Sequence, residues 1–316
     1  MEKVLLTSAG GLVGTYLTKH LKRAGNYYLV GTDMSANVPL KEKLDAFYLT
    51  SPSKGKNYLN EIEEIIQKEK IDIIIPVSSY DMEVYSHEEV KQRLQPTKWL
   101  TMDYTTHSCL HDKKTGKQFL EELGIKTPET YESQKEVLFP SILKVNKSSG
   151  SRNVVLLEKW EDYAYWKEKI KDFTIFEYLV GKEYTVDCLF DGEGKCNGYN
   201  VRERVKTNGG GAVISTCVIE ERLEEVIRKL ENCGKIKGPV NFQYKLKDGE
   251  ICIFDFNTRL ASGGLPLSVE AGFDIPQRLI HLLEGKKEAP WQLKKEQVGL
   301  TMFRYYEESY IGQQKR

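Results

Sequence analysis

Two polar residues inside an apolar run are spaced to hold a metal ion together. Asp255 and Asn257 lie two positions apart in the segment CIFDFN, residues 252–257, whose composition predicts a strand. Alternate side chains of a strand point to the same face, so we expect both oxygens on one side of a sheet. Mg²⁺ prefers oxygen ligands and usually bridges a few protein oxygens to nucleotide phosphates. The pair therefore indicates a cation site beside a phosphorylated ligand.

A lysine on a second predicted strand would suit the phosphates themselves. Lys144 belongs to the run FPSILKV, residues 139–145, and a polar loop rich in serine, residues 146–153, follows it. An inward lysine can neutralise the α- and β-phosphates of a nucleotide, and the loop can donate backbone N–H groups while closing over them. A polar hairpin loop without a ligand is the alternative interpretation.

A separate glycine-rich turn, residues 9–14, connects a predicted strand to a helix near the N-terminus. With Asp33 at the end of the next strand, it resembles the nucleotide loop of extended short-chain dehydrogenases. We favour the interpretation that these glycines allow close packing of strand and helix. An NAD(P)-dependent dehydrogenase or epimerase remains the alternative. That family needs a Tyr-x-x-x-Lys pair on a helix, and both matches lie where a long helix is not expected: Tyr131/Lys135 and Tyr178/Lys182.

The hydrophobic pattern predicts a two-part scaffold for these residues. Over residues 1–107, strands at 4–7, 28–33, 46–49 and 71–77 alternate with helices at 11–24 and 58–69. Such alternation indicates a parallel sheet with helices on both faces. After a helix expected from His111 to Leu123, strands dominate to about residue 290, and residues 291–316 form a tail that we expect to contribute a late strand.

Five segments after residue 107 carry residue types that could hold ATP between two sheets. They are His111–Lys114 with Phe119–Leu120 and Gly124–Pro128, residues 139–154, Phe176–Asp187, Arg202–Gly211, and Asn241–Gln243 with Cys252–Leu260 and Ser262–Gly264. Together they resemble the ATP-grasp superfamily, specifically single-unit proteins similar to the large chain of carbamoyl-phosphate synthase. The resemblance covers nearly the whole chain. It implies a Rossmann-like parallel α/β domain at 1–107, then a two-lobed α+β ATP-grasp domain at 108–290 whose nucleotide lobe spans about 137–180.

The resemblance also implies which residues bind ATP. Main-chain groups near Tyr178 and Leu179 would read the adenine edge, Glu177 would lie near its amino group, and Glu183 would accept from the ribose hydroxyls. An apolar wall with a few polar groups is what such a pocket needs. The remaining nucleotide contacts implied are Lys113, Lys144, Ser149, Gly150, Ser151 and Gln243.

The metal ligands and catalytic residues follow from the same matches. Gln243, Asp255 and Asn257 match the family's cation ligands, with Mg²⁺ or Mn²⁺ as the ion. Arg259 matches the arginine that contacts the γ-phosphate and the acyl phosphate, and a guanidinium fork suits planar oxyanions. The implied catalytic residues are Arg259, Lys144 and Lys113.

The reaction implied is that of an ATP-dependent carboxylate-amine ligase, which forms an acyl phosphate and passes the acyl group to an amine. Its partners would be a small carboxylate and an amine, and since dimers are common in similar families, a homodimer is one state that the resemblance allows. The chain departs from the family pattern at Asp255, where Glu is usual, and at Thr258, where Pro is usual. An ATP-binding module without turnover therefore remains a third interpretation.

Composition limits the remaining classes of function. Lys plus Arg and Asp plus Glu number 46 each, and this balance argues against a nucleic-acid surface. No apolar stretch approaches the roughly 20 residues needed to span a bilayer. The six cysteines form no C-x-x-C pair and no leader precedes them, so we expect a cytoplasmic protein with reduced thiols.

Overall fold

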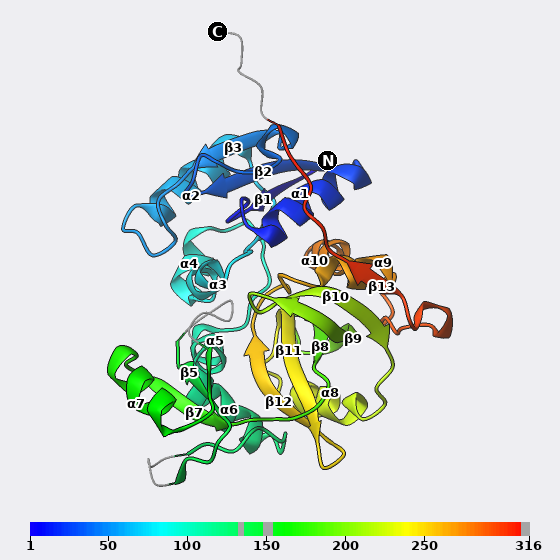
Figure 1. Cartoon of the computed structure of the whole chain (residues 1–316). Helices are drawn as coiled ribbons and strands as arrows, with labels where there is room; N and C mark the ends of the chain where they lie inside the picture. Colours follow the sequence, from blue (N-terminus) through cyan, green and yellow to red (C-terminus); the bar gives the residue numbers. More distant parts are fainter. Residues whose placement is uncertain (132–135, 148–153, 311–316) are drawn as a thin grey trace.

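The chain forms three sheets in the computed structural model, which describes residues 1–131, 136–147 and 154–310. A four-stranded parallel sheet has the order β3-β2-β1-β4. A three-stranded antiparallel sheet, β6-β5-β7, and a six-stranded sheet, β12-β11-β8-β9-β10-β13, follow along the chain (Figure 1). The expected order, a parallel α/β region before an α+β region, is confirmed.

The parallel sheet is formed by β1 (Glu2–Leu6), β2 (Tyr27–Asp33), β3 (Ala46–Leu49) and β4 (Ile73–Ile75). Helices α1 (Leu12–Ala24) and α2 (Tyr58–Glu69) cover its two faces, because alternate residues of the strands face opposite ways. In β1, Val4 and Leu6 pack in the cluster that contains α1, whereas Leu5 packs in the cluster that contains α2. Both faces of the sheet are therefore core, as in other parallel sheets.

The short helix η1 (Lys41–Lys43) lies between β2 and β3. Four helices connect this sheet to the rest of the chain: α3 (Ser79–Tyr85), α4 (Glu88–Arg93), α5 (Tyr104–His111) and α6 (Lys113–Glu122). The single helix expected from His111 to Leu123 is wrong at its start. Asp112 separates α5 from α6 in an extended conformation, and its side chain accepts hydrogen bonds from the N–H groups of Lys114 and Thr115. A carboxylate that caps the next helix in this way favours a new helix start over continuation.

The small antiparallel sheet contains β5 (Ser141–Val145), β6 (Val154–Leu157) and β7 (Phe173–Glu177), with α7 (Trp160–Lys169) packed beside it. The segment 125–131 joins this sheet to the large one. The carbonyl of Lys126 accepts from the Ile253 N–H, 2.9 Å, on the large sheet, and the N–H of Tyr131 donates to the Ile175 carbonyl, 3.1 Å, on the small sheet. The segment is therefore hydrogen-bonded to both sheets.

The large sheet consists of β8 (Tyr184–Phe190), β9 (Cys196–Asn208), β10 (Gly211–Val218), β11 (Gly238–Lys247), β12 (Glu250–Asn257) and β13 (Thr301–Phe303). One of its faces is apolar and packs against α6 and α8 (Leu223–Asn232), with Val186, Val201, Phe242 and Phe256 in that core. The opposite face carries polar residues at the alternate positions, because strand side chains alternate.

Three further elements complete the chain: α9 (Leu265–Glu270), α10 (Ile275–Leu283) and η3 (Lys295–Gln297). Helix α10 packs between the large sheet and α1 of the parallel sheet (Figure 1). Among the described residues, no helix has both the length and the apolar character that crossing a membrane would require.

Candidate active site

A cavity of about 400 Å³ lies between the three-stranded and six-stranded sheets. Its apolar wall comes from both sheets, with Ile142 and Phe176 on one side and Phe254 on the other. The predicted site residues that line it are Lys113, Lys144, Glu177, Tyr178, Leu179, Glu183, Gln243, Asp255 and Asn257. Ser149, Gly150 and Ser151 lie outside the described residues, so the structure says nothing of their predicted role.

Two lysines of β11 contact residues at the end of the cavity where adenine is expected. The ammonium of Lys245 donates to the Leu179 carbonyl, 2.9 Å, and lies 5.6 Å from the centre of the Tyr178 ring. Lys247 forms an ion pair with Glu177, 2.7 Å. The sequence reasoning missed both lysines, although they continue the two-residue spacing of Asn241 and Gln243 along one strand.

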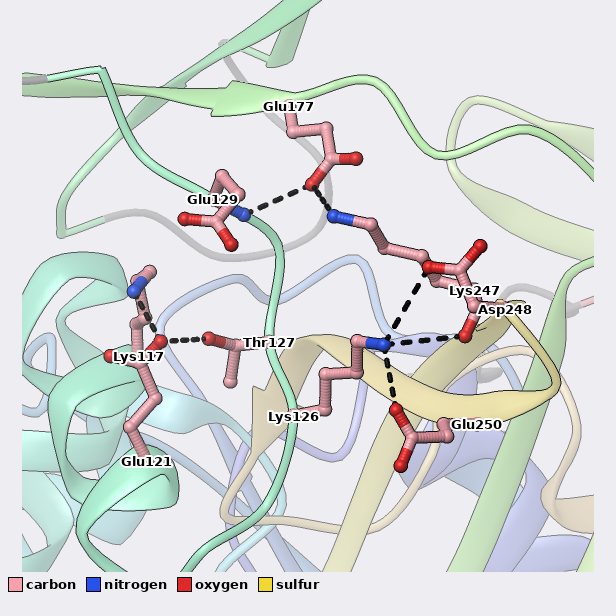
Figure 2. Close-up of polar contacts among 9 residues, drawn as sticks. All are labelled: Lys117, Glu121, Lys126, Thr127, Glu129, Glu177, Lys247, Asp248 and Glu250. Carbon is pink, nitrogen blue, oxygen red and sulfur yellow. Dashed lines mark hydrogen bonds and ion pairs between the residues drawn. The ribbon is translucent and has the colours of Figure 1, made fainter.

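Figure 2 shows how Glu177 is held. One carboxylate oxygen of Glu177 accepts from the N–H of Glu129, 3.2 Å, as well as from Lys247. The neighbouring Lys126 pairs with Glu250 at the tip of the β11–β12 hairpin, 2.7 Å (Figure 2). Because Glu177 belongs to the small sheet and Lys247 to the large one, their ion pair joins the two sheets directly at the side of the cavity.

Lys144 provides a desolvated positive charge in the cavity. Its side chain is buried, its ammonium donates to the Phe254 carbonyl, 2.7 Å, and the ammonium lies over the rings of Phe176 and Phe254. Burial lowers the pKa of Lys144 from 10.5 to about 8, and the nearby Asp255 only partly opposes this shift. No ion pair of Lys144 with a carboxylate is found in the described part of the chain. An anion that enters the cavity would therefore be stabilised by this charge.

Asp255 lies at the centre of the charged end of the cavity. Its carboxylate accepts from Lys113, 2.5 Å, and from the Asn257 amide, 2.7 Å. Burial alone would raise the pKa of Asp255, but Lys113 and Lys144 outweigh burial and hold the pKa well below its usual range. Asp255 is therefore ionised at neutral pH, which is the state needed to bind a cation.

The oxygens present fit a cation that shares its shell with phosphate. Gln243 lies directly opposite Asp255 in the β11–β12 pairing. Gln243, Asp255 and Asn257 all line the cavity. Over the residues described, no group of three or more His, Cys, Asp or Glu side chains is placed to hold a metal ion. One carboxylate and two amide side chains suit Mg²⁺ when phosphate oxygens and water complete its octahedron.

Comparisons with known proteins agree with this geometry. A family model described as "ATP-grasp in the biosynthetic pathway with Ter operon" matches residues 169–303, and one described as "PylC-like, N-terminal domain" matches residues 4–97. Biotin carboxylase from Campylobacter jejuni, solved in complex with β-γ-ATP, superposes with a TM-score of 0.72 at 17% identity, over 95% of this chain and 74% of that one. The chain has the ATP-grasp fold.

Other ATP-grasp proteins extend the comparison. N5-carboxyaminoimidazole synthetase from Staphylococcus aureus, solved with ADP, gives a TM-score of 0.71 at 15% identity, covering 91% of this chain and 78% of that one. The carbamoyl phosphate synthase large chain of Clostridium beijerinckii is 25% identical over 251 residues, which are 72% of this chain. The match spans only 23% of the length of that relative. The resemblance inferred from the sequence is confirmed, as is the predicted fold.

Arg259 does not line the ATP-grasp cavity in this structure. Its guanidinium donates to the Ser79 hydroxyl of α3, 3.0 Å, and to the Leu260 carbonyl, 2.8 Å. Arg259 continues the two-residue spacing of Asp255 and Asn257 just after β12. Burial lowers the pKa of Arg259, and the negative charge of Asp255 opposes this shift. The structure thus places Arg259 where the large sheet meets the first domain, beyond the cation ligands.

Arg204 of β9 enters the ATP-grasp cavity instead. Its side chain is buried, its guanidinium lies 2.6 Å from the Glu183 carboxylate, and it donates to the Gly210 carbonyl, 2.6 Å. The sequence reasoning named the basic segment that contains Arg204 without singling out this residue. The strand alternation Asn200, Arg202, Arg204 would have placed it on the polar face with the cation ligands.

In the N-terminal glycine turn, the carboxylate of Asp33 binds a backbone N–H group. One oxygen of Asp33 accepts from the Gly10 N–H, 2.9 Å, the donor that would otherwise meet a phosphate. A Cβ at Gly14 would lie 2.6 Å from the Ala9 backbone, so this glycine allows close packing of helix and strand. Both observations favour the packing interpretation of the turn over dinucleotide binding.

Proposed function

We propose that this chain is an ATP-dependent ligase that activates a carboxylate as an acyl phosphate for attack by an amine. The observation that carries the proposal is the convergence in one cavity of the desolvated Lys144, the ionised Asp255 and the amide side chains of Gln243 and Asn257. Mg-ATP, when bound, supplies the phosphoryl group and the cation that offsets its charge. Two structural neighbours, the biotin carboxylase and the N5-carboxyaminoimidazole synthetase, were solved in complex with β-γ-ATP and ADP, which supports an adenine nucleotide here.

The residues of the cavity have distinct proposed tasks. Tyr178, Leu179 and Glu177 would bind the base, and Glu183 the ribose. Lys144 and Lys113 would bind the phosphates, and Gln243, Asp255 and Asn257 the cation. Arg259, which contacts Ser79 at the domain junction, would bind the acid as it is phosphorylated. Positioning and electrostatic stabilisation supply most of the rate in phosphoryl transfer, and these charged groups are already held in place.

A phosphate-release screen tests the function. Purified protein with Mg²⁺ and ATP would be presented with carboxylates crossed with amino acids and other amines, with Asp255→Ala as the control for contaminating ATPases. We expect phosphate release that requires one acid and one amine together. Equal phosphate release by the Asp255→Ala variant would refute the assignment of the cation site.

The second candidate is an ATP-binding module without turnover. It is favoured by two departures from the family pattern, Asp255 in place of Glu and Thr258 in place of Pro. Tight binding of Mg²⁺ with a non-hydrolysable ATP analogue, combined with no phosphate release across the whole panel, would select this candidate.

A further inference from the structure

The polar face of the large sheet extends well past the cation ligands. In the strand pairing, Asp255 lies opposite Gln243, Gln243 opposite Thr185, and Thr185 opposite Arg202. The adjacent row runs from Asn257 through Asn241 and Asp187 to Asn200. Directly paired residues share a face of a sheet, so Arg202 and Asp187 lie on the same surface as the proposed cation site.

Arg202 and Asp187 form a fully buried ion pair on this face. Their side chains are 1% and 2% exposed, and Nε and Nη2 of Arg202 donate to the two carboxylate oxygens at 3.0 and 3.3 Å. Ser268 of α9 donates to Asp187, 2.6 Å, and Asn200 donates to Ser268, 3.0 Å. A buried pair of this kind is costly to desolvate and is weak support for stability by itself, so a positional role is the better explanation.

A glycine turn rests on the guanidinium. A Cβ added to Gly264 would lie 1.8 Å from Cζ of Arg202, and one added to Gly263 would lie 3.0 Å from the backbone nitrogen of Ala212. The turn, residues 260–264, begins directly after Arg259, whose carbonyl accepts from the Asn241 amide, 2.7 Å. Both ends of the turn thus contact the polar face. Asn241 binds the carbonyl of Arg259 at one end, and Arg202 packs against Gly264 at the other.

We propose that Arg202 is a positioning residue for the acid substrate: with Asp187 it forms the platform on which residues 260–264 rest, and it thereby sets the place of Arg259. The proposal depends on the function proposed above. Arg202 lies outside the lining of the nucleotide cavity, so its loss should weaken use of the acid and leave nucleotide binding intact. A displacement of about 1 Å in a reacting group can cost ~10²-fold, so small movements of the turn should be measurable.

Two variants disturb the platform in different ways. Gly264→Ala forces the turn away from the guanidinium. Arg202→Met combined with Asp187→Leu removes both charges together, which avoids leaving one buried charge unpaired. Gly14→Ala is the matched control, because its Cβ would likewise overlap a packed neighbour, the Ala9 backbone at 2.6 Å, but in the parallel-sheet domain.

The first measurement is the KM for the acid identified by the phosphate-release screen, compared with the Kd of a non-hydrolysable Mg-ATP analogue. We expect both platform variants to raise the KM for the acid by ~10–100-fold while the analogue Kd changes by less than about twofold. A rise no larger than that in Gly14→Ala, or a parallel rise in the analogue Kd, would overturn the proposal.

Hydrogen–deuterium exchange separates this proposal from the proposed function. If the wild-type protein releases no phosphate with any acid, the ligase assignment fails, and the platform is then tested by exchange alone. We expect faster deuterium uptake over residues 259–265 in both platform variants than in wild type and in Gly14→Ala. Equal deuterium uptake in all four proteins would refute the proposal that Arg202 and Asp187 support the turn.

Discussion

The ammonium of Lys113 lies 2.5 Å from the Asp255 carboxylate, although the two residues are 142 positions apart. Lys113 begins α6 and Asp255 lies near the end of β12, so the fold of the second domain brings them together. Lys113 thus compensates the charge of Asp255. In a complex with Mg-ATP, Asp255 would help to hold the cation and the ammonium of Lys113 would bind phosphate.

The first prediction concerns the two charged residues at the centre of the cavity. Asp255→Ala and Lys144→Ala should each lower ADP formation by at least ~10²–10³-fold, because each removes a group that stabilises the transferring phosphoryl oxygens. Circular dichroism should show that both variants stay folded. Asp255→Asn is the matched control for shape, and wild-type turnover by it would argue that the negative charge is not needed.

The second prediction is a pH dependence of nucleotide binding. Burial lowers the pKa of Lys144 to about 8, so in the free protein this side chain loses its charge as pH rises through that value. The affinity for a Mg-ATP analogue should therefore fall above about pH 8, with the charged form favoured below it. Lys144→Arg keeps its charge and should give a flatter profile. Titration calorimetry from about pH 7 to about pH 9.5 tests both, and identical slopes would contradict the assignment.

The third prediction concerns His107, which is buried in α5 and hydrogen-bonded through Nδ1 to the Thr258 hydroxyl, 2.8 Å. Burial, assisted by the neighbouring His111, lowers its pKa from 6.5 to about 4. Below pH 6.5 the unfolded chain binds a proton at this position that the folded chain does not. The free energy of unfolding should fall as pH drops from about 6.5 to about 4, by roughly 3 kcal/mol in total.

His107→Gln isolates this contribution, because glutamine can still bond to Thr258 but does not titrate in this range. Denaturant unfolding at about pH 7.5 and about pH 4.5 should show a smaller acid-side loss for the variant than for wild type. If both proteins lose the same free energy between these two pH values, His107 does not carry the acid sensitivity.

The fourth prediction tests the N-terminal glycine turn. Gly14→Ala should destabilise the protein by about 1–3 kcal/mol, since its Cβ would overpack the turn that joins β1 to α1. Affinity for the Mg-ATP analogue should not change, and neither wild type nor variant should bind NAD(P). Thermal unfolding and calorimetry measure the two effects, and saturable NAD(P) binding by wild type would revive the dehydrogenase interpretation.

Local patterns explain which residues of the cavity could be picked out from the sequence. Asp255 and Asn257 are two positions apart on one strand, so their shared face followed from spacing, and Lys144 is the one charged residue in the apolar run 139–145. The start of α6 was missed, although an aspartate followed by two polar residues is a usual helix cap. Lys245 and Lys247, near the expected adenine position, continue the two-residue spacing of Asn241 and Gln243, but the sequence analysis did not use this pattern.

The sequence by itself indicated the main strands, several helices and the residue types of the cavity, because apolar periodicity acts between near neighbours along the chain. Tertiary structure alone decided which of these residues meet. Asp255 pairs with Lys113, Arg259 contacts Ser79 at the domain junction, and Arg202 lies under Gly264. Such contacts depend on strand order, register and the packing of one domain on another, and none of these is set by the spacing of residues along one segment.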